Sequence, residues 1–214
     1  MDEDISIINT NTRKEKIKNF FINNKKSLVT FISLALLIIF TYFFLEEVKD
    51  RKTKSLSEKY NNIIINFNNS DKINIKNQLI EIIKKKDSTY SPLALYFIID
   101  NEIQASNEEI NEYFDIIINE TSLEKEIKNL IIYKKGLFNS EFENENNLIL
   151  ILNPVIKSES IWKSHALYLI AEYFFDKNQK QKAKEFYNKI LSYEKSNDNI
   201  KLEAQKRLTM DLSE

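Results

Sequence analysis

One uninterrupted apolar run, Leu28 to Leu45, constrains this chain of 214 residues more than any other feature. The run has no charged residue, and as an α-helix it would be about 27 Å long, close to the thickness of a bilayer's hydrocarbon core. Lys25 and Lys26 flank it on the N-terminal side. We predict a cytoplasmic N-tail over 1–27, a transmembrane signal-anchor helix over 28–45 and a helical domain over 46–214.

Two other interpretations of the run stay open. A cleaved signal peptide has a shorter apolar core and small residues at its cleavage site, whereas the exit of this run, 42–48, offers none. The core helix of a soluble protein can also be apolar, but a run of this length without a polar face favours a span.

Charge on the two flanks does not orient the span by itself. Six basic residues lie between positions 13 and 26, and five lie between 49 and 59. Because long domains cross membranes largely regardless of their charge, we expect the charge of the short N-tail to decide the orientation of the span. The N-terminus is then predicted in the cytoplasm and the domain on the opposite side.

Glycine and cysteine usage narrows the fold class. Gly136 is the single glycine. Phosphate-binding loops need several glycines, and tight hairpins usually need a glycine in each turn. The chain has no cysteine, which excludes disulfides and thiolate metal sites. A net charge of −1 provides no basic field for nucleic acid. We therefore predict an all-α fold, no metal or other cofactor, and no nucleic-acid partner.

Helix-terminus signals divide the domain into short helices. Ser91 before a proline is expected to be an N-cap, and Ser106–Glu109 and Thr121–Glu124 fit capping boxes. Helices are expected to end near Gly136 and at Asn153–Pro154. The last three helices are predicted over 159–176, 179–192 and 198–212. Short gaps between such helices favour antiparallel helix pairs.

The window 164–197 fits the 34-residue tetratricopeptide pattern best. Ala171 and Ala183 would let the two helix backbones approach, and the aromatic residues would fill the groove to the next helix pair. Asn178, Ile190 and Lys195 depart from the usual residues. The repeat-defining packing residues are expected to be Leu167, Ile170, Ala171, Phe174, Ala183, Tyr187 and Ile190. The fold prediction is a tetratricopeptide-like α-hairpin solenoid, with an unrelated helical bundle as the alternative.

In this register, Tyr168, Glu172 and Phe175 face the concave side of the solenoid. Exposed aromatic residues interleaved with a charge suit the binding of a partner segment. We predict that these three form a partner-binding groove. The alternative is that Phe175 packs against the following helix.

The sequence offers little to support catalysis. His165 is the single histidine and is expected at a surface or interface. Paired acids such as Glu108–Glu109 can perform glycosidic chemistry, but their positions suit helix first turns and a polar loop. We predict no catalytic or metal-binding residue, and an enzyme that uses acidic pairs is the least favoured alternative.

Four segments, in order along the chain, resemble the ancillary SecYEG translocon subunit (YfgM-like) family of single-pass inner-membrane proteins with a tetratricopeptide-like domain. They are Lys16–Lys25 before the span, Lys86–Ala94, Trp162 before the last repeat pair, and Thr209–Ser213. The resemblance covers nearly the whole chain, which departs from the family in its low alanine and glycine content and its degenerate middle repeat.

The resemblance implies a non-enzymatic protein of the bacterial inner membrane with its C-terminal domain in the periplasm. Its implied partners are the SecYEG translocon and a membrane-anchored periplasmic chaperone, and its implied role is assistance to Sec-dependent protein export. A tethered helical-repeat scaffold for envelope assembly or cell division is the alternative function.

Overall fold

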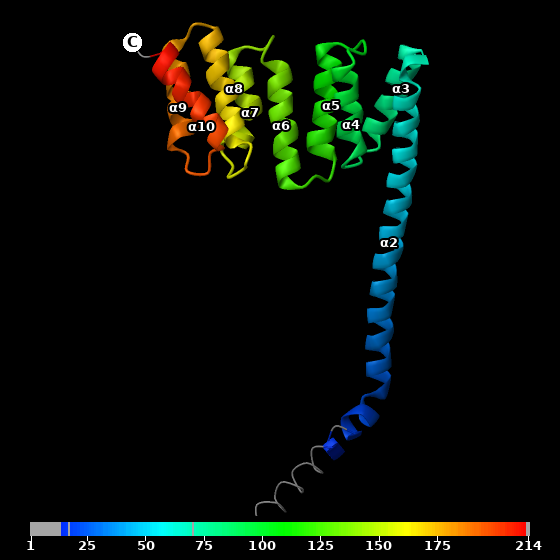
Figure 1. Ribbon diagram of the computed structural model, residues 1–214. Helices are drawn as coiled ribbons and strands as arrows, with labels where there is room; N and C mark the ends of the chain where they lie inside the picture. The colour runs from blue at the N-terminus through cyan, green and yellow to red at the C-terminus, as the bar shows by residue number, and fades with distance from the viewer. Residues whose placement is uncertain (1–13, 17, 70, 213–214) are drawn as a thin grey trace, which may run out of the picture. The chain divides into compact units, whose positions relative to one another are not determined.

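The computed structural model describes residues 14–16, 18–69 and 71–212 (Figure 1). These residues form helices and turns without a β-strand, so the all-α prediction is confirmed for the described part. The chain divides into two compact units, Met1–Ser55 and Leu56–Glu214. The predictions for Arg13, Ile17, Ser213 and residues 1–12 lie outside the described residues.

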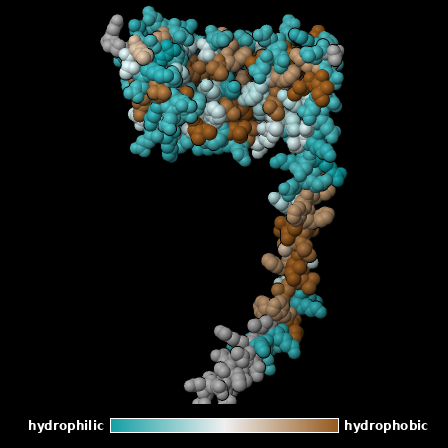
Figure 2. Space-filling view, in the orientation of Figure 1, coloured by the Kyte–Doolittle hydropathy of each residue, from teal (hydrophilic) through white to brown (hydrophobic). Residues whose placement is uncertain are grey.

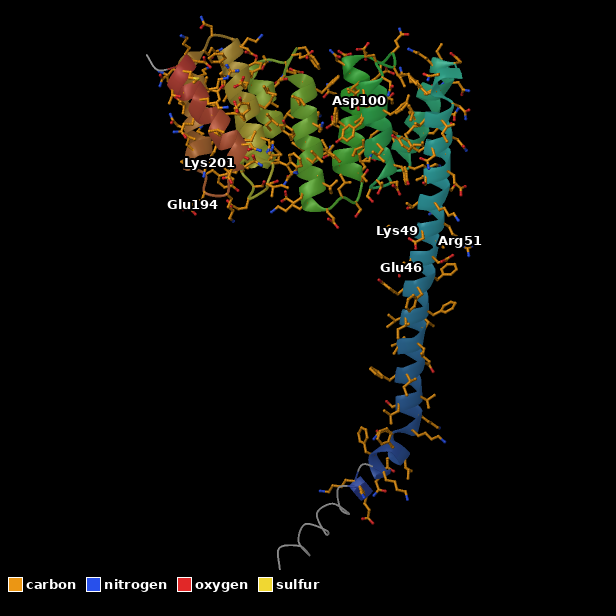
Figure 3. The ribbon with its side chains drawn as sticks, in the orientation of Figure 1. Glu46, Lys49, Arg51, Asp100, Glu194 and Lys201 are labelled. Atoms are coloured by element: carbon orange, nitrogen blue, oxygen red, sulfur yellow. The ribbon has the colours of Figure 1, made fainter. Side chains whose placement is uncertain are left out.

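The apolar run lies in α2, one unbroken helix over Lys25–Ile65 that is followed by the 3₁₀ turn Phe67–Asn69. None of its most apolar 18-residue window is buried, which does not support a buried core helix. Among the described residues, α2 is the one helix that is long enough and apolar enough to cross a membrane. Figure 2 shows the run as a hydrophobic band, and Figure 3 marks Glu46, Lys49 and Arg51 just after it.

The second unit begins with the last turns of α2. Ile63 is buried there, and the Tyr60 ring lies 5.8 Å from the Tyr90 ring and 6.4 Å from the Phe97 ring. Aromatic pairs at these separations add to the energy of burial alone. These contacts attach the end of α2 to the helices that follow it.

Further helices of the second unit follow one another in a row (Figure 1). From α5 onward their connections alternate between the lower and upper edges of the row in Figure 1, so neighbouring helices run in opposite directions. Consecutive helices from α3 to α10 pack against one another, and the pairs α3–α5, α6–α8 and α8–α10 also touch. The helices are α3 Lys72–Lys84, α4 Tyr90–Asp100, α5 Asn107–Glu120, α6 Lys125–Asn139, α7 Glu145–Ile156, α8 Lys163–Asp176, α9 Lys180–Ser192 and α10 Asp198–Lys206.

A continuous apolar core runs through this unit, and Leu79, Leu95, Ile117, Leu148 and Ile170 are among its fully buried members. Figure 2 shows hydrophobic side chains gathered over the middle of the row on the visible face, with a mostly hydrophilic surface around them. Burial of these faces drives the short helices together, because isolated helices of this length are marginal in water.

Two of the three predicted N-terminal signals are wrong. Ser91 lies inside α4, where its buried hydroxyl reaches the carbonyl oxygens of Ile82 and Ile83 at 3.0 and 3.1 Å. Thr121 does not cap α6, which has Glu124 at its N-cap position without a side-chain cap. The capping box of Ser106 and Glu109 is confirmed, with both reciprocal hydrogen bonds present.

Two residues that were expected to end helices lie inside them. Pro154 is inside α7, which continues to Ile156. Gly136 is inside α6, and a Cβ built on it would lie 2.4 Å from Leu152 Cδ2. The glycine therefore serves the close approach of α6 and α7 instead of ending a helix.

Candidate functional site

The seven residues expected to define the repeat lie in the core of the last helix pair. Each has an exposed fraction of 2% or less: Leu167, Ile170, Ala171, Phe174, Ala183, Tyr187 and Ile190. Ala171 and Ala183, one on each helix, are fully buried. Their small side chains allow the backbones of α8 and α9 to approach closely.

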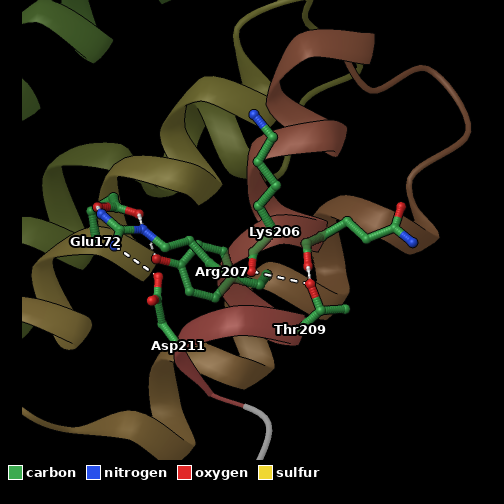
Figure 4. A network of polar contacts seen from close by, with 7 residues as sticks. Glu172, Lys206, Arg207, Thr209 and Asp211 are labelled. Atoms are coloured by element: carbon green, nitrogen blue, oxygen red, sulfur yellow. Dashed lines mark hydrogen bonds and ion pairs between the residues drawn. The ribbon is translucent and has the colours of Figure 1, made fainter.

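The three predicted groove residues, Tyr168, Glu172 and Phe175, lie together on one side of α8 and are half-buried. The structure adds Arg207, from the π-helical turn Arg207–Asp211 that follows α10. Its Nε donates to Glu172 Oε1 at 3.0 Å and its Nη2 donates to Oε2 at 2.6 Å (Figure 4). Such a bidentate pair fixes the geometry of both side chains.

Arg207 also reaches its other neighbours. Its Nη1 donates to Asp211 Oδ2 at 3.0 Å, and its guanidinium carbon lies 4.6 Å from the centre of the Phe175 ring. A cation over an aromatic face at this distance is attracted to the ring. Phe175 therefore packs beneath the turn after α10, and the groove residues are partly covered instead of freely exposed.

Two tyrosines complete the cluster. The Tyr187 hydroxyl donates to Glu172 Oε1 at 2.5 Å, and the Tyr168 and Tyr187 rings meet edge to face at 5.9 Å. Burial, followed by the nearby Glu172 carboxylate, raises the pKa of both tyrosines. Hydrogen bonding to Glu172 raises the pKa of Arg207. At neutral pH these three groups are therefore protonated, and Tyr187 and Arg207 donate hydrogen bonds to the Glu172 carboxylate.

A hollow that could not be predicted from the sequence lies among α4, α5 and α6. It has a volume of about 640 Å³ and is lined by aromatic side chains with charges beside them. A neighbouring hollow of about 400 Å³ reaches α7 and shares Asn107 and Phe142 with it. The sequence signal for the first hollow is limited to four aromatic residues, Tyr96, Phe114, Phe138 and Phe142, with no periodicity that separates them from core residues.

The other residues considered in the sequence lie outside the cluster around Glu172 and outside the hollow. His165 is half-buried, with its ring centre 5.2 Å from that of Trp162 and 5.9 Å from that of Tyr133. Lys25 and Lys26 are exposed at the start of α2. Within the described ranges, no group of three or more histidine and carboxylate side chains could hold a metal ion.

The acidic pairs do not form a shared site. Glu109 belongs to the capping box and pairs with Lys76 Nζ at 3.0 Å. Glu126, at the start of α6, accepts a hydrogen bond from the Ser160 hydroxyl at 2.6 Å. These contacts tie neighbouring helices together.

The fold and its site define a helical protein with one candidate membrane-spanning helix near the N-terminus. No protein-family model, curated protein or solved structure matches the chain.

Proposed function

We propose that this chain is a non-enzymatic, membrane-anchored interaction protein that assists Sec-dependent protein export. The observation that carries the proposal is one apolar helix followed by a row of short helices with a continuous core. Long helical rows offer extended surfaces to other polypeptides. The resemblance of the sequence to the translocon subunit family supports export as the process.

We further propose a tetratricopeptide-like arrangement for the row. In such a solenoid, equivalent helices of successive pairs touch, and the α6–α8 and α8–α10 contacts fit that rule. The buried alanines of α8 and α9 occupy the sites where the repeat needs small residues. The row would then repeat with α6–α7 and α8–α9 as pairs and α10 as the closing helix.

The proposed location is the bacterial inner membrane, with the N-terminus in the cytoplasm and the second unit in the periplasm. The proposed partners are the SecYEG translocon and a membrane-anchored periplasmic chaperone. The partner face would include Tyr168, Glu172 and Phe175, whose aromatic and charged groups lie side by side and are half-buried.

Crosslinking in native membranes, followed by affinity capture of the full chain, tests the proposal. We expect adducts with the translocon and the chaperone, and we expect the double variant Tyr168→Ala, Phe175→Ala to lose at least part of them. Ile161→Ser is the control, because this side chain is 66% exposed and takes no part in the cluster. Far-ultraviolet circular dichroism verifies that each variant is helical.

The outcomes separate the candidate functions. Adducts with division or envelope-assembly proteins alone would replace the export role with that of a tethered scaffold. Equal capture by the wild type and the double variant would remove the proposed partner face while leaving the partners themselves in place.

A further inference from the structure

The hollow among α4, α5 and α6 combines three properties that are rarely found together on an ordinary surface. Its walls are aromatic, its rim is charged, and one of its polar atoms lacks a partner. Its lining comes from the C-terminal parts of α4 and α6, from the segments that follow them, and from Asn107 and Phe114 of α5.

The apolar lining is large enough for a bulky side chain. Phe114 is 1% exposed and belongs to the core, Phe138 is half-buried beside it, and their ring centres lie 6.1 Å apart. Leu137 and Phe142 are 42% and 43% exposed. Exposed apolar groups around a recess mark a binding site more often than scattered ones do.

The charges beside this lining are mainly acidic. Asp100 on α4 (Figure 3), Glu102 and Glu141 are exposed, and none of them makes an ion pair in the described part of the chain. Lys134 is the one basic residue of the lining, and its Nζ lies 5.9 Å from the centre of the Tyr96 ring. Three carboxylates against one ammonium favour a cationic ligand.

Tyr96 supplies the unpartnered atom. Its hydroxyl oxygen is buried and has no hydrogen-bond partner among the described residues, although its ring lines the hollow. A buried hydroxyl without a partner is costly, and this one can donate a hydrogen bond to an acceptor that reaches it.

We propose that this hollow binds an extended polypeptide segment through one bulky apolar side chain with a lysine or arginine next to it. The apolar side chain enters between Tyr96, Phe138 and Phe142, and the cation meets the rim carboxylates. The inference rests on the proposed function as an interaction protein, and it specifies the chemistry of one polypeptide that the domain takes.

Fluorescence anisotropy with the full chain in nanodiscs tests the inference, with empty nanodiscs as the blank. The probe is a labelled peptide that alternates phenylalanine and lysine, separated by serine. Two peptides of the same length replace either lysine by glutamate or phenylalanine by serine. We expect the first peptide to bind at least about tenfold more tightly than either of the others, since both charge and apolar contact contribute.

Matched variants locate the binding. Asp100→Asn, Glu102→Gln and Glu141→Gln together should weaken the first peptide about tenfold, and Phe142→Ser should weaken it similarly. The charge-matched control is Glu58→Gln, Glu185→Gln and Glu194→Gln, at exposed carboxylates that line neither hollow. This control should bind as the wild type does, and each variant must keep the circular dichroism of the wild type.

Equal affinity for all three peptides, or equal loss in the control variant, would overturn the inference. Self-association of the chain that Phe142→Ser abolishes, with no peptide bound, would show that a second copy covers the hollow and would also overturn it. Failure of peptide binding with intact translocon adducts removes only this inference. Peptide binding without such adducts removes the export proposal and leaves the hollow as a polypeptide site.

Discussion

Arg207 and Glu172, 35 residues apart in sequence, form a bidentate ion pair that joins the turn after α10 to α8. Their side chains are 33% and 23% exposed, so the pair is partly shielded from water. Charge-assisted hydrogen bonds are stronger in such surroundings than on an open surface. The pair fixes the C-terminal turn over the predicted groove.

Breaking this pair should destabilise the last helices. We expect Arg207→Gln or Glu172→Gln to lower the free energy of unfolding by about 1.5–3 kcal/mol, the range for hydrogen bonds to charged groups. In the double variant the two losses should not add, because the residues interact directly. Urea unfolding of the full chain in detergent, followed by circular dichroism, measures all four corners of the cycle.

The neighbouring residue provides the control for this cycle. Lys206 pairs with Glu203 at 2.7 Å, and both side chains are about half exposed. Lys206→Gln should change the free energy of unfolding by less than about 0.5 kcal/mol, as is usual for exposed pairs. A coupling energy for Arg207 and Glu172 no larger than this would mean that the bidentate pair does not hold the turn.

Replacing the single glycine should be unfavourable despite the higher helix propensity of alanine. Gly136→Ala gains up to about 1 kcal/mol in propensity but forces Leu152 to move, which typically costs about 1–3 kcal/mol. We expect a net loss of stability. In a Leu152→Val background the same substitution should cost less, and denaturant unfolding of both pairs of variants measures the difference. An equal cost in both backgrounds would mean that the Leu152 contact does not limit position 136.

The sequence allowed the helical class and the long apolar helix to be predicted, because both follow from local periodicity and composition. It did not reveal that Gly136 sits under Leu152 or that Ser91 reaches the carbonyls of α3, because these depend on how separate helices meet. The terminus rules were correct where the cap is local, as at Ser106. They were wrong at Ser91 and Gly136, where a neighbouring helix changes the surroundings.

The candidate site also contains residues whose proximity follows from local spacing and residues whose proximity depends on how separate helices meet. Tyr168, Glu172 and Phe175 share a helix face, so their proximity could be predicted from spacing alone. Arg207 could not, since nothing local indicates that a residue beyond α10 returns to α8. The hollow around Tyr96 was missed because its lining comes from three helices and the connections between them.

High pH should lower the stability of the wild type relative to that of Tyr96→Phe. Burial, followed by the charge of Asp100, raises its pKa to about 12, compared with 10.0 for a free tyrosine. The folded state therefore favours the neutral phenol. The stability associated with the neutral phenol is complete below about pH 10 and is lost as the pH rises to about 12. The free energy of unfolding of the wild type should fall relative to that of Tyr96→Phe across this window, as urea unfolding at each pH would show.

A second variant separates this effect from the general loss of lysine charge. Leu202→Ala changes an exposed side chain of α10 and should keep a constant difference from the wild type over the same pH range. Tyrosinate absorbance of Tyr96→Phe should also lack one group that titrates near pH 12. Identical pH dependence of the wild type and Tyr96→Phe would contradict the raised pKa.

Single cysteines can establish the membrane topology, because the chain contains no cysteine of its own. Glu194→Cys places a thiol in the connection after α9, and Glu15→Cys places one in the N-tail; both positions are exposed. In spheroplasts of a Gram-negative host, a membrane-impermeant maleimide should label the first variant before lysis and the second only after lysis. The reverse pattern would invert the proposed orientation. A mature chain recovered without the thiol at position 15 would show that the apolar run is a cleaved signal and not an anchor.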